Sequence, residues 1–275
     1  MKITLLGTGS PIPSPDRAGP ATLVQSGTSN ILFDCGRGVV MRLAQAQLFP
    51  SMLSGVVLTH LHSDHVCDLN DVITTHWVMS PPGASLRIVG PLGTRAFVDA
   101  TLVALALDVG YRVRHHDDLS EGPALDVLEV EPGATFTIGD QEVVAGATDH
   151  RPVEPTLGYR ITDDGKSVVI AGDGVPCASL DDLVRGATAY VQTVIRDDLV
   201  ALIPSERLHD ILDYHSSVAH AADTAKRAGV KALVLTHYVP SPSPGSEDEW
   251  RRLAGGFDGL IVIGDDLTSL DLDTL

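Results

Sequence analysis

The sequence contains few cysteines, and their spacing excludes one class of protein. Cys35, Cys67 and Cys177 are the only three, they are far apart, and none belongs to a CxxC pair. An odd number of widely spaced cysteines does not make a disulfide framework and is typical of proteins from a reducing compartment. We therefore expect a cytoplasmic protein rather than a small, disulfide-stapled secreted one.

Long hydrophobic runs are also absent. No apolar stretch approaches the roughly 18 residues that a membrane-spanning helix needs. The first residues, MKITLLGTGS, hold one lysine and an apolar run that ends at Gly7, which predicts a strand and a turn instead of a signal peptide. The sequence predicts no contact with a membrane.

Basic residues are also few in this sequence. Lysine and arginine total 19 against 36 aspartate and glutamate residues, which gives a net charge of −17. Such a charge repels polyanions at long range, so a nucleic-acid substrate would need a local basic patch. The charge therefore favours a small anionic substrate over RNA.

The remaining composition predicts one globular unit. The chain has 275 residues, of which 44% are apolar, and this length permits a core that needs no covalent staple. No stretch is rich enough in proline, glycine or serine to separate two domains, and we expect a single domain over residues 1–275.

Short β-branched runs alternate with helical patterns along the whole chain. GVVLT (55–59), SVVIAG (167–172) and KALVLTH (231–237) are continuous apolar runs of the kind that strands buried on both faces require. Helical spacing occurs at 39–48, 94–108, 180–186 and 218–229, and from Val66 onward with Ser63 or Asp64 as a cap. Strands and helices mixed in both halves predict an α/β protein with a pair of sheets between outer helices, a four-layer αββα sandwich.

The segment THLHSDH (59–65) concentrates chemistry directly after a strand. His60 and His62 can point into one cavity, and Asp64 and His65 can turn toward a second position beside it. Imidazole and carboxylate ligands suit zinc and tolerate iron or manganese. A core has no use for such a cluster, because unpaired buried polar groups are destabilising.

Three further candidate ligands each end a strand-like run: His150, Asp173 and His237. If all of them converge, one ion is bound by His60, His62 and His150, and Asp173 bridges it to a second ion. Asp64, His65 and His237 then bind that second ion. Two such ions would supply hydroxide at neutral pH from a bridging water, which predicts a hydrolase.

The segment HLHSDH (60–65) resembles the HxHxDH signature of the metallo-β-lactamase superfamily. LLGTGSPIPSPDRAGPATLV, ILFDCG, TDHRPVEPTLGYRI, VVIAGD and LVLTHY are similar to motifs of its ribonuclease Z and arylsulfatase branch, so the resemblance covers nearly the whole chain. It implies an αββα fold with two zinc ions and a homodimer. It also implies that Asp34 supports the histidine loop, and that His215, in DYHSS, protonates the leaving group while Asp64 orients the hydroxide.

Two departures from that branch affect the expected substrate. The 22 residues between His150 and Asp173 leave no space for the long arm with which ribonuclease Z enzymes hold tRNA, and VQTVIR (191–196) stands where the branch often has HEAT. We therefore expect cleavage of a small phosphodiester or an aryl sulfate by a two-metal, bridging-hydroxide mechanism. The alternatives are a tRNA 3′-processing endoribonuclease and a lactone or thioester hydrolase. Arg17 and Arg37, in loops near the predicted site, are candidates for binding an anionic substrate.

Overall fold

Two seven-stranded sheets form the centre of the molecule. The computed structural model describes all 275 residues. The first sheet has the strand order β14 (Ser269–Asp271), β1 (Lys2–Gly7), β2 (Ala21–Ser26), β3 (Ser29–Phe33), β4 (Gly55–Val57), β5 (Ser85–Gly90), β6 (Ala124–Glu129). The second has the order β13 (Leu260–Ile263), β12 (Ala232–Val239), β11 (Ala189–Ile195), β10 (Lys166–Ile170), β9 (Leu157–Asp163), β8 (Gln141–Ala147), β7 (Thr135–Ile138).

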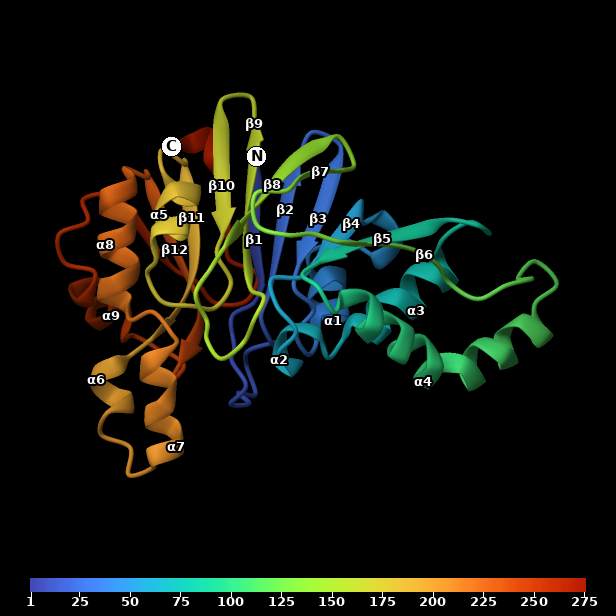
Figure 1. Cartoon of the computed structure of the whole chain (residues 1–275), viewed down its shortest axis with the longest axis horizontal. Coiled ribbons are helices and arrows are strands. Elements are labelled where there is room, and N and C mark those ends of the chain that lie inside the picture. The colour runs from blue at the N-terminus through green and yellow to red at the C-terminus, as the bar shows by residue number, and fades with distance from the viewer.

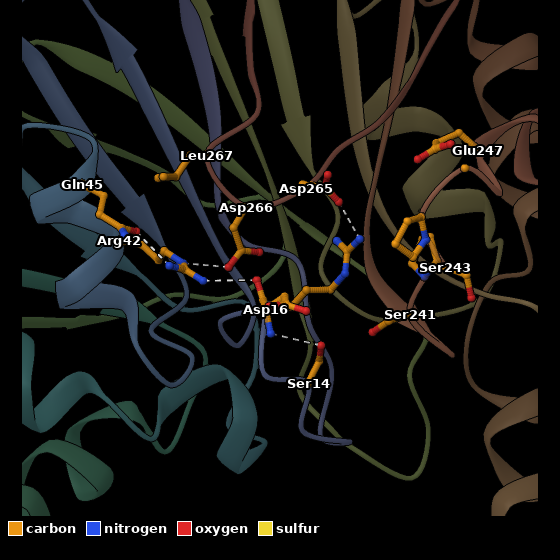
Figure 2. Close-up of a pocket in the computed structure, with 14 residues that line it drawn as sticks. Ser14, Asp16, Arg42, Gln45, Ser241, Ser243, Glu247, Asp265, Asp266 and Leu267 are labelled. Atoms are coloured by element: carbon orange, nitrogen blue, oxygen red, sulfur yellow. Dashed lines mark hydrogen bonds and ion pairs between the residues drawn. The ribbon is translucent and has the colours of Figure 1, made fainter.

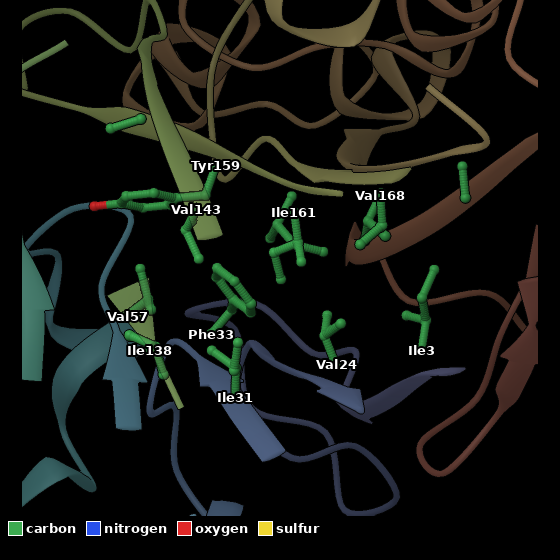
Figure 3. Packing of buried hydrophobic residues seen from close by; sticks show 14 of the residues in the cluster. Ile3, Val24, Ile31, Phe33, Val57, Ile138, Val143, Tyr159, Ile161 and Val168 are labelled. Atoms are coloured by element: carbon green, nitrogen blue, oxygen red, sulfur yellow. The ribbon is translucent and has the colours of Figure 1, made fainter. Parts of the chain in front are cut away.

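The inner faces of the two sheets share one apolar core. Phe33 and Val57 of the first sheet belong to the same buried cluster as Tyr159 and Ile161 of the second, and Figure 3 shows these side chains facing one another across the gap. The Phe33 and Tyr159 rings lie 6.0 Å apart, centroid to centroid. Apolar burial of this extent is the main force that holds the sheets together.

Helices cover the outer face of each sheet, which confirms the αββα sandwich (Figure 1). The first sheet is covered by α1 (Val39–Gln45), α3 (Leu69–Met79) and α4 (Thr94–His115), and the second by α5 (Ala178–Val184), α8 (Val218–Ala228) and α9 (Glu247–Leu253). Strands such as β11 and β12 are buried along their whole length because both of their faces are covered. No helix combines the length and the apolar character needed to cross a bilayer.

Two details differ from the sequence prediction. The helical pattern from Val66 is two helices, α2 (Ser63–Val66) and α3, so Ser63 and Asp64 lie inside α2 and neither caps it. The segment before His215 folds into α6 (Asp197–Val200), α7 (Glu206–His209) and the 3₁₀ turn η2 (Asp210–Asp213), which the sequence analysis did not predict. These elements form a helical hairpin (197–213) that extends away from the sheets in Figure 1.

Strand direction explains why distant residues meet. β3 and β4 run parallel in the first sheet, and β10, β11 and β12 run parallel in the second. β8 runs in the same direction as β10, because each is antiparallel to β9. Carboxyl ends of parallel strands lie at one edge of a sheet, and loops at that edge commonly form ligand sites. His150, Asp173 and His237 lie at or after the carboxyl ends of β8, β10 and β12, which brings them to one edge of the second sheet. The loop after β4 of the first sheet meets them there, where His62 contacts His150.

Candidate metal centre

Three histidines form one half of the cluster. His60 and His62 leave β4 in extended backbone, and His150 follows β8. The Nδ1 atom of His62 lies 3.0 Å from Nε2 of His60 and 3.3 Å from Nε2 of His150. We call these residues the three-imidazole position.

The second group lies beside it and contains a carboxylate. Asp64 and His65, in α2, meet His237, in β12. Oδ2 of Asp64 is 3.2 Å from Nε2 of His237 and 3.7 Å from Nε2 of His65. We call this group the Asp64 position. The two groups have the memberships that the sequence predicted.

Asp173 lies between the two groups. It follows β10, is 3% exposed, and its Oδ2 atom lies 3.3 to 3.9 Å from ring nitrogens of five histidines. The five are His60, His65, His150, His215 and His237. This position, in contact with both groups and with His215, is the one required of a bridging ligand.

Side chains hold the histidine loop in place. The carboxylate of Asp34 accepts hydrogen bonds from the Thr59 backbone N–H (2.8 Å), the Thr59 hydroxyl (2.9 Å) and Nδ1 of His65 (2.8 Å). The Thr59 hydroxyl also lies 3.0 Å from Nδ1 of His60. Bonds at Nδ1 leave Nε2 of both rings free to face the cluster. Asp34 has a φ of 61°, a left-handed conformation that aspartate tolerates better than most residues.

Backbone carbonyls orient two histidines of the other half. Nδ1 of His150 donates to the carbonyl oxygen of Tyr214 at 2.8 Å, and Nδ1 of His215 faces that of Ile211 at 3.3 Å. Ile211 lies in η2, at the end of the helical hairpin, and Tyr214 is the residue directly after it. The hairpin therefore fixes the direction of imidazoles on both sides of Asp173.

Protonation differs between the two positions. Burial lowers the pKa of His60, His62 and His150, in the last case to about 4, so these rings are neutral near pH 7. Burial acts in the same direction on His65 and His237, but the charge of Asp173, with Asp34 or Asp64, outweighs it and raises both pKa values. Burial alone would raise the pKa of Asp173, yet His237 and His65 hold it well below its usual range.

The cluster fits divalent metal ions. Nε2 of His65 and Oδ1 of Asp173 are buried without a hydrogen-bond partner, a costly arrangement unless something else binds them. Ring nitrogens of His60 and His150 converge on His62 at 3.0 and 3.3 Å, a spacing at which one cation can be bound by all three. Ligand nitrogens on one tetrahedral zinc ion are separated by about 3.3 Å, given Zn–N bonds of roughly 2.0–2.1 Å.

A cavity of about 310 Å³ opens over the cluster. His62, Asp64, Asp173, His215 and His237 face it, so an ester that enters it reaches both groups and His215. Predicted ligands from three separate segments therefore line one accessible space. His150 and Asp34 are not in its lining and contact the cluster through His62 and His65.

Arg17 and Arg37 do not face this cavity. Arg17 donates to Thr8 (2.6 Å) and Asp265 (2.6 Å) and lines another cavity, of about 510 Å³. Figure 2 shows that second cavity, where Arg42 bonds Asp266. Arg37 donates to the carbonyls of Ser10 and Pro11. Both guanidinium groups are used within the fold, which removes the expectation that they bind substrate.

Sequence comparison identifies the relatives of the chain. Residues 29–238 match the family model described as "Beta-lactamase superfamily domain". A protein of Mycobacterium bovis (strain BCG / Pasteur 1173P2) named Ribonuclease Z is 53% identical over 99% of this chain and 98% of its own length. One of Mycobacterium avium (strain 104) with the same name is 54% identical and covers 99% of both chains.

Solved structures show the same fold. The metallo-β-lactamase fold protein YhfI from Bacillus subtilis has a TM-score of 0.73 at 23% identity, covering 98% of this chain and 99% of its own. The short form of human tRNase Z has a TM-score of 0.72 at 24% identity, with 99% of both chains covered.

The fold and the clustered ligands define a metal-dependent hydrolase. Within that class, the chain belongs to the ribonuclease Z family of the β-lactamase superfamily.

The sequence analysis missed two residues that support the cluster, Thr59 and Tyr214. Thr59 could have been noticed, because VVLTH (56–60) and LVLTH (233–237) repeat a threonine directly before a histidine. Tyr214 acts on His150 through its carbonyl, and a backbone contact leaves no signal in residue type.

Proposed function

We propose that this protein is a metal-dependent endoribonuclease of the ribonuclease Z type, which cleaves a phosphodiester bond at the 3′ side of precursor tRNA. The observation that carries the proposal is the position of Asp173 Oδ2, within 3.9 Å of ring nitrogens from both ligand groups and from His215. The names of relatives that match the chain over 99% of its length support the choice of RNA as substrate.

The expectation of a small phosphodiester or aryl sulfate substrate loses its support. It depended on the missing arm, on VQTVIR (191–196) in place of HEAT and on the net charge of −17. The structure does place β9 and β10 within residues 151–172. However, the Mycobacterium bovis relative aligns over 275 residues that cover 98% of its length, so it has no long arm either. A protein without the arm can therefore carry the name Ribonuclease Z, and the missing arm is no argument against RNA.

The residues of the cavity have separable roles in this proposal. His60, His62 and His150 would hold one ion, and Asp64, His65 and His237 would hold the other, with Asp173 between the two groups. Bound divalent ions would lower the pKa of a coordinated water and offset the charge that builds on a phosphoryl group. Asp64, which lines the cavity, would orient the attacking water.

His215 completes the reaction. Its Nε2 lies 3.3 Å from Asp173 Oδ2 and the ring faces the cavity. From there it holds a proton for the departing oxygen, which is a poor leaving group when unprotonated. Asp34 supports the histidine loop through His65 and Thr59.

The donor set supports zinc as the native metal, because histidine and aspartate are ligands that zinc prefers. Both sheets contribute ligands, which supports residues 1–275 as one catalytic domain. The homodimer and the cytoplasmic location stay predictions, and light scattering coupled to size exclusion tests the first.

The test is an assay of the zinc-loaded protein on precursor tRNA with a 3′ trailer, beside bis-p-nitrophenyl phosphate and an aryl sulfate. We expect cleavage of the precursor at one position and loss of that cleavage in His62→Ala. Turnover of the small esters with the precursor left intact would reinstate the small-substrate reading.

A further inference from the structure

The cavity over the ligand cluster is lined by apolar and aromatic side chains as well as by the ligands. These side chains, which we call the apolar wall, come from three segments that are far apart in sequence. They are Pro11 and Ile12 from the first loop, Leu208, Ile211 and Tyr214 from the helical hairpin region, and Val239. Ile12 is 50% exposed, so apolar surface lies open to solvent next to a site that binds an anionic ester.

The hairpin side of this apolar wall is fixed relative to the ligands. The Tyr214 carbonyl accepts from His150, and its ring packs against those of His150 and His215 at centroid distances of 5.3 and 4.8 Å. Ile211 faces the cavity while its carbonyl contacts His215. Tyr214 and Ile211 therefore cannot move without moving the imidazoles.

The loop side is fixed by Arg37. Its guanidinium donates to the carbonyls of Ser10 (3.0 Å) and Pro11 (3.1 Å), which holds Pro11 and Ile12 at the rim. A preorganised wall of this kind gains affinity because little order has to be created when a ligand binds.

We propose that this wall is a nucleobase subsite, which takes the base of the nucleotide adjoining the scissile phosphate; the inference rests on the proposed function. A phosphate held by the ligand cluster carries its nucleoside substituents into the same cavity. Apolar and aromatic side chains stack on the faces of bases. Beyond the ligands and His215, the hydroxyls of Ser63 and Tyr214 are the only polar side-chain groups of the residues that line the cavity, so few groups can read base edges. The subsite therefore accepts all four bases.

The test is calorimetric titration of the zinc-loaded protein with nucleoside 5′- and 3′-monophosphates, with ribose 5-phosphate as the ligand that lacks a base. Of the 5′- and 3′-monophosphates, we take the series that binds more tightly. We expect its nucleotides to bind at least about tenfold more tightly than ribose 5-phosphate, within the range found for base–aromatic stacking. The four bases should agree within about threefold.

Two variants and one matched control assign the gain to the wall. Tyr214→Ala and Leu208→Ala should each reduce the advantage of the nucleotide over ribose 5-phosphate at least about fivefold, with zinc content unchanged. Leu202→Ala removes a leucine of the same hairpin that is 78% exposed and does not line the cavity, and it should keep the full advantage.

The outcomes separate this inference from the proposed function. Suppose that the wild-type protein cleaves precursor tRNA but binds nucleotides and ribose 5-phosphate with equal affinity. This result would overturn the nucleobase subsite and leave the proposed function intact. A preference for one base above about tenfold would overturn its tolerance of all bases. Failure to cleave precursor tRNA, with the nucleotide advantage intact, would overturn the proposed function and leave a nucleotide site.

Discussion

The two halves of the molecule hold the predicted metal ligands in different ways. The first sheet delivers His60, His62, Asp64 and His65 in one short loop, and a side chain, Asp34, supports that loop through three hydrogen bonds. The second sheet delivers His150, Asp173 and His237 from three separate strands. There, backbone carbonyls rather than side chains orient His150 and His215.

This difference determines what substitution can change. A side-chain support can be removed by one mutation, whereas a carbonyl support persists whatever residue carries it. The first half should therefore be sensitive to changes outside the ligands, and the second half should be sensitive only at the ligands and His215. The predictions below test that contrast.

The largest effect is expected where the halves meet, at Asp173. Replacing it with alanine removes the one carboxylate that contacts both groups and leaves five buried imidazoles without it. We expect Asp173→Ala to lose most bound metal and to lower turnover at least about a thousandfold. A decrease of that size corresponds to the loss of several kcal/mol of charge stabilisation in the transition state. Elemental analysis and the cleavage assay measure both. Asp182→Ala, at an exposed ion pair with Arg185, is the control. Full metal content in Asp173→Ala would contradict a bridging role.

His215 should affect chemistry without affecting metal content. Its loss removes a proton donor, and general acid catalysis contributes typically about 10²–10⁴-fold. We expect His215→Ala to keep its metal and to slow esters with poor leaving groups at least about tenfold more than p-nitrophenyl esters. His115→Ala, an exposed histidine at the end of α4, is the control. Equal losses on both kinds of ester would remove the acid role.

Asp34 tests the side-chain support of the first half. Both oxygens of Asp34 accept hydrogen bonds from N–H groups. In Asp34→Asn one of these oxygens becomes an NH₂ donor, which then faces the Nδ1–H of His65 or the backbone N–H of Thr59. Changes to such supporting contacts typically cost about 10–100-fold in metal affinity or activity, and we expect a loss in that range. Asp140→Asn is matched, because Asp140 also accepts backbone and hydroxyl bonds, from Thr28, at a turn outside the cluster. Similar losses in both variants would indicate general destabilisation.

Sequence alone predicted the layers, and it predicted candidate ligands that the structure brings together, because both depend on residue type. Continuous apolar runs predicted strands buried on both faces, and β4 and β12 confirm that pattern. The structure then places six of the seven predicted ligands in two groups, with Asp173 between them. The helical hairpin escaped prediction because its helices have only four residues each, too short for a periodic pattern. The carbonyl supports escaped because every residue has a carbonyl.

Thr59 tests a smaller side-chain support. Its hydroxyl links His60 to Asp34, so Thr59→Val leaves Nδ1 of His60 buried without that partner. An unsatisfied buried donor costs roughly 1–3 kcal/mol, and we expect metal affinity at the three-imidazole position to fall about five- to tenfold. Thr236→Val is a close control, because Thr236 also precedes a histidine, His237, but its hydroxyl has no partner. Competition with a chromophoric chelator measures both affinities, and an equal loss in Thr236→Val would refute the assigned contact.

The smallest effect is expected at Tyr214, and it is the sharpest test of the carbonyl support. Tyr214→Phe removes only the hydroxyl, which makes no hydrogen bond, and keeps both the carbonyl that accepts from His150 and the ring that lines the cavity. Metal content and turnover should therefore stay within about twofold of wild type, whereas the Asp34→Asn change alters both. Because surface changes without a specific contact usually shift stability by less than about 0.5 kcal/mol, thermal unfolding should be nearly unchanged. Loss of metal in Tyr214→Phe would show that a side chain supports the second half as well, and the contrast between the halves would fail.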